Sequence, residues 1–220
     1  MRPRGTNRAE IDNWIVQHTP QGGRVLDIGC GTGDLLGWLV QEKGIRGTGI
    51  EIAEECVVRA VQRGLSVHHG NVEEGLDHYG NQSFDLVVMS LTIQELNKPI
   101  HVLRESFRVG KQIIVVFPNF AHWQTRVQLG ILGRAPRTPS LPYTWHESPN
   151  RHVLTIDDWD EFCQQRGWLQ ISRAFVTKGK VVHWWPNLRA EVAMYLLEMD
   201  PARRNHANGA KAGTAVASSQ

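Results

Sequence analysis

Hydrophobic positions near the start of the chain recur at the spacing of one face of a helix. The residues that follow this period are Ala9, Ile11, Trp14, Ile15 and His18. Pro20 and two glycines shortly after it, Gly22 and Gly23, then interrupt the pattern. Because proline and glycine end helices, we predict an amphipathic helix that leads into a first strand.

The next part of the chain alternates between short apolar runs and amphipathic helical patterns. The predicted strands are Arg24–Ile28, Gly47–Ile52, Leu65–His69, Phe84–Ser90 and Gln112–Phe117, and the predicted helices are Asp34–Lys43, Glu54–Arg63 and Ile100–Arg108. Strands that are apolar throughout and are joined by helices indicate a parallel sheet covered on both faces. The pattern therefore predicts an α/β, doubly wound fold.

The amino-acid composition changes after Phe117. The span from there to Arg151 holds five of the ten prolines among aromatic and basic residues, so we predict a long, stiff excursion. Regular patterns return with a helix at Ile156–Arg166, for which Thr155 is the predicted N-cap. Two further apolar stretches are predicted as an antiparallel pair of strands that closes the sheet, with a short helix as the alternative for the second: Leu169–Val176 and Ala190–Leu197.

Length and composition narrow the possible classes of protein. With 220 residues, we expect one domain over residues 1–200 and a disordered tail over the polar residues 201–220. The longest apolar run, Ile113 to Phe117, is too short to span a bilayer, and no apolar segment follows the basic N-terminus, so we expect a cytoplasmic protein. A net charge of +2 with dispersed basic residues argues against nucleic-acid binding. Three cysteines without CxxC spacing and scattered histidines predict no metal site.

A glycine-rich turn follows the first predicted strand, in Val25-Leu-Asp-Ile-Gly-Cys-Gly-Thr-Gly33. Gly29, Gly31 and Gly33 remove side chains where the backbone bends and where a ligand approaches it closely, and Cys30 is interpreted as a small packing residue. Dinucleotide-binding turns have the spacing GxGxxG. Here the third glycine comes one residue early, so a nicotinamide-dependent dehydrogenase is a distant alternative.

Asp27 places a carboxylate two residues before the turn. A carboxylate suits an ammonium group better than a pyrophosphate. S-adenosylmethionine (SAM) has no phosphate and carries a cationic amino group, so we interpret the turn as a SAM site with Asp27 as a direct or indirect partner of that group. The alternative is that Asp27 only accepts hydrogen bonds from amides of the turn.

The second and third predicted strands end in polar groups at the same edge of the sheet. Glu51 is predicted to accept the ribose hydroxyls of an adenosine. Asn71 and Val72 are predicted to recognise adenine, and the alternative is that Asn71 only stabilises a turn. The full predicted cofactor-binding set is Asp27, Gly29, Cys30, Gly31, Glu51, Ile52, Asn71, Val72 and Ser90.

The chain resembles class I SAM-dependent methyltransferases in three motifs: the glycine turn, Gly49-Ile-Glu51 and Ser83-Phe-Asp-Leu-Val-Val-Met-Ser90. It is similar to the MetW family of methionine biosynthesis in five later motifs: Arg108-Val-Gly110, Phe117-Pro-Asn-Phe-Ala-His-Trp123, Leu141-Pro-Tyr-Thr-Trp145, Pro149-Asn-Arg-His152 and Pro186-Asn-Leu-Arg-Ala-Glu-Val192. The resemblance implies a seven-stranded, mostly parallel sheet with an antiparallel C-terminal hairpin. It also implies SAM or S-adenosylhomocysteine as ligand and a homoserine O-acyltransferase as partner. Two features depart from the class: Asn71 stands where such proteins often have Asp, and the loop after the fourth strand reads Leu91-Thr-Ile-Gln-Glu95.

Methyl transfer from a sulfonium depends mainly on positioning the acceptor and excluding water, so no catalytic residue is predicted. The polar residues expected near the methyl group are Gln94, Glu95, Asn119, His122, Tyr143 and His152. Two functions are therefore left open. The chain is either an accessory subunit of the acyltransferase, as the resemblance implies, or a free-standing methyltransferase acting on a small metabolite.

Aromatic residues are frequent after Phe117. Trp123, Tyr143 and Trp145 are interpreted as core residues beneath a lid, with stacking on a substrate as the alternative. If Trp184 and Trp185 lie in extended chain, one ring faces the core and the other faces outward. Because exposed tryptophan is enriched at protein interfaces, Tyr143, Trp145 and the Trp184–Trp185 pair are the predicted anchors for a partner.

Overall fold

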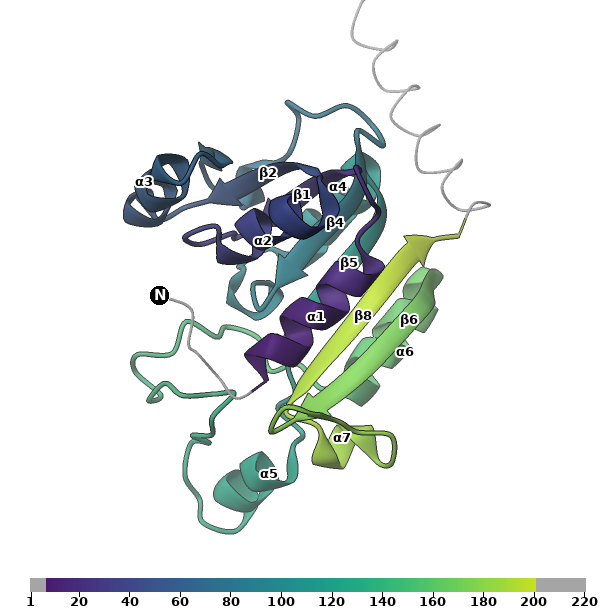
Figure 1. The fold of residues 1–220 in the computed structure, drawn as a ribbon. Helices are drawn as coiled ribbons and strands as arrows, with labels where there is room; N and C mark the ends of the chain where they lie inside the picture. The colour runs from purple at the N-terminus through teal and green to yellow at the C-terminus, as the bar shows by residue number, and fades with distance from the viewer. Residues whose placement is uncertain (1–6, 201–220) are drawn as a thin grey trace, which may run out of the picture.

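A computed structural model describes residues 7–200 of the chain and contains one mixed sheet (Figure 1). Its strands are β1 (Arg24–Ile28), β2 (Arg46–Glu51), β3 (Ser66–His69), β4 (Phe84–Ser90), β5 (Gly110–Pro118), β6 (Trp168–Thr177), β7 (Lys180–Val181) and β8 (Val192–Met199). The strand order is β3-β2-β1-β4-β5-β8-β6-β7. Strands β1 to β5 are parallel, and β8 runs antiparallel to both β5 and β6. The predicted doubly wound fold is confirmed.

The sheet has eight strands, one more than predicted. The additional strand β7 has two residues and pairs antiparallel with the end of β6. Lys178 and Gly179 both have positive φ in the tight turn between them. A two-residue strand is too short to show an alternating pattern in the sequence. The predicted antiparallel pair of long strands is present as β6 and β8, with an irregularity between Gln170 and Ser172.

The sheet is accompanied by seven α-helices and two short 3-10 turns within residues 7–200. They are α1 (Arg8–His18), α2 (Asp34–Lys43), α3 (Glu54–Gln62), η1 (Val72–Glu74), η2 (Ile93–Glu95), α4 (Pro99–Val109), α5 (Trp123–Gly130), α6 (Ile156–Arg166) and α7 (Pro186–Arg189). Helix α6 begins and ends at the predicted residues. Thr155 Oγ1 accepts a hydrogen bond from the Asp158 amide at its start, and Gly167 adopts the left-handed conformation at its end.

Helix α5 is a correction, because the excursion after Phe117 was expected to lack regular structure. The prolines explain the difference: none occurs between Pro118 and Pro136, and α5 occupies part of that window. A proline-free stretch leaves every amide available for helical hydrogen bonds. The predicted disordered tail, residues 201–220, lies outside the described residues.

The helices cover the two faces of the sheet with two separate hydrophobic clusters. One cluster joins α1 and α2 to one face, and the other joins α4 and α6 to the opposite face, as Figure 1 shows. In β5, Ile113 and Val115 belong to the α4–α6 cluster, whereas Ile114 and Val116 belong to the α1–α2 cluster. Burial on both faces is the reason why the central strands are apolar throughout. No helix within residues 7–200 is long and apolar enough to cross a bilayer.

Several tryptophans of the second half of the chain are exposed. The side chains of Trp123 and Trp145 are 47% and 80% exposed, so their predicted place in the core is wrong. Trp184 and Trp185 are both exposed as well, at 76% and 74%. They lie in a bend before α7, where Trp185 has a φ of +49°, and not in an extended segment that would bury one of the two rings.

Candidate functional site

A cavity of about 890 Å³ lies at the carboxyl ends of β1, β2 and β3. The glycine turn, the ends of β2 and β3, and the loop after β4 all line it. The strand order reverses between β1 and β4, so the cavity lies at the switch point of the sheet. Doubly wound proteins bind ligands at this position, in sites of roughly 300–1,000 Å³.

The glycine turn needs its glycines for two different reasons. Gly29, Gly31 and Gly33 have φ values of +69°, +58° and +74°, a region that favours glycine. A Cβ atom on Gly29 would lie 2.8 Å from the side chain of Thr92, and one on Gly33 would lie 2.4 Å from Leu65 Cδ1. Gly29 and Gly33 therefore allow close packing against Thr92 and Leu65. Gly29 and Gly31, with Cys30 between them, also line the cavity, where the absence of a side chain leaves the backbone accessible.

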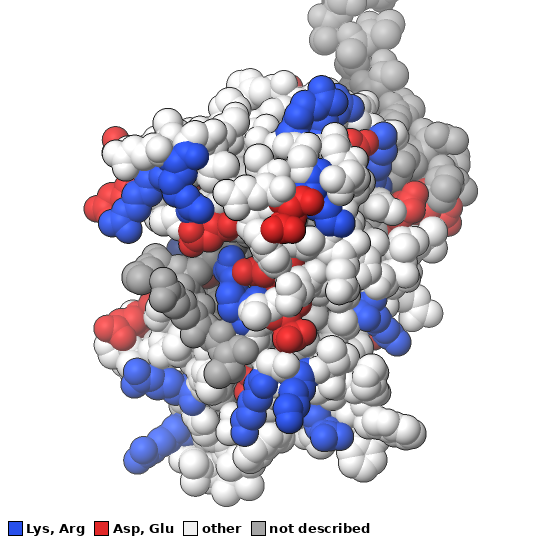
Figure 2. Space-filling view, in the orientation of Figure 1, with Lys and Arg blue, Asp and Glu red and all other residues white. Residues whose placement is uncertain are grey.

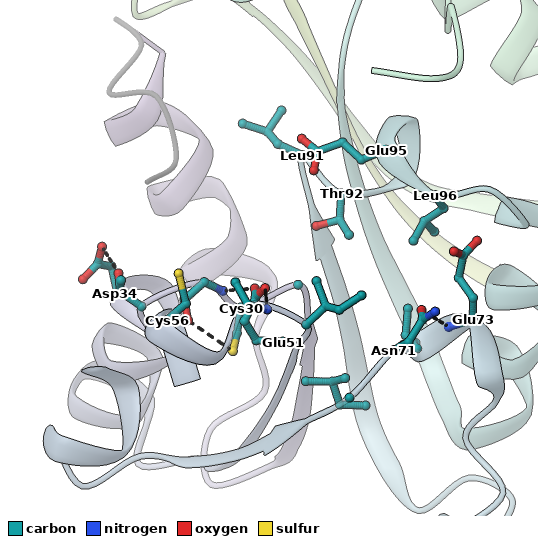
Figure 3. Close-up of a pocket in the computed structure, with 18 of the residues that line it drawn as sticks. Cys30, Asp34, Glu51, Cys56, Asn71, Glu73, Leu91, Thr92, Glu95 and Leu96 are labelled. Carbon is teal, nitrogen blue, oxygen red and sulfur yellow. Dashed lines mark hydrogen bonds between the residues drawn. The ribbon is translucent and has the colours of Figure 1, made fainter. Parts of the chain in front are cut away.

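Glu51 lies at the end of β2 with its carboxylate held beside the glycine turn (Figure 3). Its Oε2 accepts a hydrogen bond of 2.8 Å from the Gly31 amide, and its Oε1 accepts one of 2.9 Å from the Ala53 amide. A carboxylate oxygen can accept more than one hydrogen bond. The two amides therefore orient the Glu51 carboxylate, which can still accept hydrogen bonds from hydroxyl groups of a ligand.

Asn71 and Val72 line the cavity at the end of β3, as predicted for this edge of the sheet. Asn71 Oδ1 accepts a 3.0 Å hydrogen bond from the Glu73 amide and caps η1. The turn-stabilising role of Asn71 is thus present. Recognition of adenine by Asn71 and Val72 stays a prediction.

The loop after β4 forms the wall opposite Glu51 (Figure 3). Leu91 has a φ of +57°, which is unfavourable for a residue with a Cβ atom. Its amide donates to the Val116 carbonyl at 2.9 Å, and its carbonyl accepts from Gln94 Nε2 at 2.8 Å. Thr92 Oγ1 donates to the Ile28 carbonyl at 3.1 Å. These bonds hold a strained loop against the end of β1.

Two predicted binding residues do not line the cavity. Asp27 and Ser90 are fully buried within β1 and β4. Their predicted roles in binding stay predictions. Cys30 and Ile52 do line the cavity, and the Cys30 sulfur packs so closely that a Cβ atom on Gly49 would lie 2.5 Å from it. This contact accords with the interpretation of Cys30 as a packing residue.

Of the polar residues expected near a methyl group, Glu95 lines the cavity. Gln94 is buried behind the wall, where its carbonyl accepts from the amides of Arg151 and His152. A ring nitrogen of His152 lies 2.9 Å from the Leu96 carbonyl. His152 does not line the cavity, and neither do the remaining three residues: Asn119, His122 and Tyr143.

The first helix contributes residues to the cavity that the sequence reasoning missed. Arg8 and Asp12 line it, and Arg8 Nε lies 2.5 Å from Asp12 Oδ2. Their spacing of four residues on a helix was the available signal. Trp38 of α2 and Arg151 of the excursion also line the cavity. The excursion thus reaches the site as expected, but through Arg151 and not through the four residues predicted for it: Asn119, His122, Tyr143 and His152.

Two carboxylates of the cavity are held in their charged form. Burial alone would raise the pKa of Asp34, but hydrogen bonds from Arg63 and Thr32 bring it below its usual value. The pKa of Glu73 is also lowered, because hydrogen bonds from the Asn97 side chain and the Lys98 amide outweigh the effect of burial. Both carboxylates are therefore ionised at neutral pH, and Asp34 is paired with Arg63 at 2.6 Å, while Arg8, Arg59 and Arg151 add positive charge to the cavity.

His122 is buried away from the cavity, at the start of α5. Burial holds its pKa below the usual value of 6.5; attraction to Glu191 acts in the opposite direction, and Lys178 adds to the lowering. The unfolded chain therefore binds a proton more readily than the folded chain. We expect the free energy of unfolding to fall as the pH drops below about 6.5.

Urea denaturation at about pH 7.5 and about pH 5.5 checks this expectation. His122→Gln should lose less stability between the two values than the wild type does. His101→Gln, at an exposed position of α4, is the matched control and should keep the wild-type pH dependence. Equal losses in wild type and His122→Gln would contradict the assignment.

Curated relatives and solved structures resemble the chain to different extents. The bifunctional methionine biosynthesis protein MetXA/MetW of Rhodopirellula baltica is 34% identical over 153 residues, which are 66% of this chain and 25% of that protein. The chain thus spans about a quarter of the length of this relative. A demethylmenaquinone methyltransferase of Listeria monocytogenes is 26% identical over 69% of this chain and 72% of its own.

Among solved structures, a SAM-dependent methyltransferase from Archaeoglobus fulgidus matches with a TM-score of 0.63 and 16% identity, over 87% of this chain and 92% of that one. This likeness shows that the fold is that of the class I methyltransferases. The family model for the methionine biosynthesis protein MetW matches residues 8–197 of the sequence, which is nearly all of the described chain. The chain therefore belongs to the MetW family.

Proposed function

We propose that the cavity binds SAM or S-adenosylhomocysteine. The observation that carries this proposal is the Glu51 carboxylate, which two backbone amides hold at the rim of a glycine turn. The residues fit an adenosine with a cationic tail, because the turn lines the cavity without bulky side chains and carboxylates that include Glu51, Glu73 and Glu95 line it as well. When bound, SAM supplies a methyl group on a cationic sulfur.

Each wall of the cavity has its own proposed role toward this ligand. Glu51 accepts hydrogen bonds from the ribose hydroxyls. The backbone of Gly29, Cys30 and Gly31 lies against the ligand. Asn71 and Val72 contact adenine. The strained loop at Leu91 closes the opposite side and excludes water from the ligand.

We further propose that the protein is an accessory subunit of a homoserine O-acyltransferase in the cytoplasm. Membership of the MetW family supports a place in methionine biosynthesis. The Rhodopirellula relative, whose name combines MetXA and MetW in one polypeptide, supports physical association of the two activities. In the complex, SAM bound to this protein then modulates acyl transfer by the acyltransferase.

A free-standing methyltransferase is the second candidate. The Listeria demethylmenaquinone methyltransferase supports it by its similarity over most of this chain. Glu95 supports it as well, because this acidic side chain lies in the cavity wall opposite Glu51, where a methyl acceptor would need a polar contact.

Reconstitution separates the two candidates. The homoserine O-acyltransferase of the same organism is assayed for acyl transfer alone, with this protein, and with its Glu51→Ala variant, in the presence of methyl-labelled SAM. We expect acyl transfer to rise at least about tenfold when the wild type is added, a change in barrier of about 1.4 kcal/mol. Full acyl transfer without this protein, together with labelled methyl in a metabolite product, would favour the second candidate.

A further inference from the structure

One end of the molecule is built from two segments that are far apart in the sequence. They are residues 119–137, which contain α5, and residues 178–190, which contain β7 and α7; we call this region the α5–α7 end. Asn119 joins the two segments, because its Nδ2 donates to the carbonyls of Asn187 and Ala190. In Figure 1, α5 and α7 lie together at the lower end of the molecule, away from α3.

The α5–α7 end presents large apolar side chains to solvent. Trp184 and Trp185 are about three-quarters exposed, and Ile131 is 77% exposed just beyond α5. The further exposed apolar residues of this end are Trp123, Leu129, Leu132 and Val181. None of the seven lines the cavity. Large exposed apolar side chains that gather at one end of a folded protein are typical of interaction sites.

The charges of the α5–α7 end are all of one sign. Its two segments contain six cations and no Asp or Glu: Arg126, Arg134, Arg137, Lys178, Lys180 and Arg189. All six are exposed, and none forms an ion pair within the described part of the chain. Figure 2 shows the result as blue and white atoms over the lower end of the molecule. Since the whole chain has a net charge of +2, this end is far more basic than the rest.

We propose that the α5–α7 end is a docking surface for an acidic face of a second folded protein. Trp184, Trp185 and Ile131 enter an apolar centre on the partner, and the cations around them pair with its carboxylates. Tryptophan and arginine are the residues most enriched at the energetic centres of protein interfaces. This inference rests on the proposed function, under which the partner is the acyltransferase.

The composition of the surface favours a protein partner over other occupants. Exposed aliphatic side chains such as Leu129 and Ile131 neither stack on bases nor bind phosphate, which argues against a nucleic acid. Four of the six cations are arginines, the cation enriched at protein interfaces, where lysine is depleted. A second copy of this chain is disfavoured, because the six cations of each copy would repel those of the other.

The position of the surface leaves the cavity accessible in the complex. No residue of the α5–α7 end lines the cavity, whose walls come from the ends of β1 to β3, the loop after β4, α1, α2, α3 and Arg151. The protein can therefore bind its small ligand and its partner at the same time. Simultaneous binding is required if the ligand is to modulate the partner.

Calorimetric titration of the full-length chain into the acyltransferase tests the proposal. The variants are the pair Trp184→Ser/Trp185→Ser and the charge reversal Arg134→Glu/Arg137→Glu. We expect each to raise Kd at least about tenfold, and the wild-type Kd to rise with salt. Val61→Ser on α3, at a position 52% exposed, and Arg104→Glu on α4 are the matched controls and should bind like the wild type. Circular dichroism and SAM affinity, unchanged in all variants, show that the fold is intact.

The remaining outcomes are distinguishable. If the wild type binds the acyltransferase and both patch variants bind equally well, this surface is wrong and the proposed function stands. If the wild type does not bind, the proposed partnership fails, and the acidic partner named here fails with it. Binding to phosphatidylcholine–phosphatidylglycerol vesicles or to oligothymidylate that is lost in the patch variants, while binding to the acyltransferase is retained, would overturn the proposal in favour of a lipid or a nucleic acid.

Discussion

Replacing Gly31 by Val is expected to abolish SAM binding while the protein remains folded. Gly31 has a φ of +58°, lines the cavity and donates its amide to Glu51 at 2.8 Å. A residue with a Cβ atom is destabilised by about 1–2 kcal/mol at such a φ, and a β-branched residue by more. We therefore expect the added bulk to take up space in the cavity and the strained backbone to weaken the hydrogen bond from the Gly31 amide to Glu51.

Gly44→Val controls for backbone strain alone. Gly44 has a φ of +57°, almost identical to that of Gly31, but it ends α2 and nothing lies within 4 Å of a Cβ atom placed on it. Both variants should lose similar amounts of stability, and only Gly31→Val should lose calorimetric SAM binding. If Gly31→Val has native circular dichroism and binds SAM like the wild type, the ligand does not lie on this turn.

Glu51→Ala is expected to weaken SAM binding by ten- to a hundredfold. The carboxylate is already oriented by the amides of Gly31 and Ala53, so little reorganisation opposes its acceptance of the ribose hydroxyls. A charge-assisted hydrogen bond of this kind contributes about 1.5–3 kcal/mol, which corresponds to that range of affinity. Glu51→Gln keeps an acceptor oxygen without the charge and should fall between the two.

Glu74→Ala serves as the matched carboxylate deletion, because Glu74 is exposed in η1 and does not line the cavity. Isothermal calorimetry with SAM and with S-adenosylhomocysteine should give the wild-type Kd for this control. An unchanged Kd in Glu51→Ala would remove the ribose assignment. Comparable affinity for NADH in the wild type would instead restore the dinucleotide alternative.

The elements that the sequence predicted best are those whose ends are marked by local chemistry. Helix α2 runs from Asp34 to Lys43 as predicted, because Gly33 and Gly44 flank it in left-handed conformations. Helix α6 matches for the same kind of reason, with Thr155 and Gly167 at its ends. Strand β7 and helix α5 had no comparable signals: one is too short for a period, and the other lies in a segment whose composition suggested no regular structure.

The residues of the site were predictable where it is made of strand ends, whereas the residues of distant segments that return to it were not. Glu51 and Asn71 follow directly from the rule that parallel strands meet at one edge. Arg151 reaches the cavity because the amides of Arg151 and His152 donate to the Gln94 carbonyl, a contact across more than fifty residues. Asp27 is completely buried in β1, which its position two residues before the glycine turn does not reveal.

The late position of β8 in the sequence has a consequence for the synthesis of the chain. Strand β8 lies between β5 and β6, so β6 and β7 reach the rest of the sheet only through it. Until Val192–Met199 leave the ribosome, the apolar strand β5 is an open edge, and such edges readily pair with other chains. The nascent protein is therefore exposed to aggregation until its last strand emerges, and a premature stop before Val192 leaves that edge open permanently.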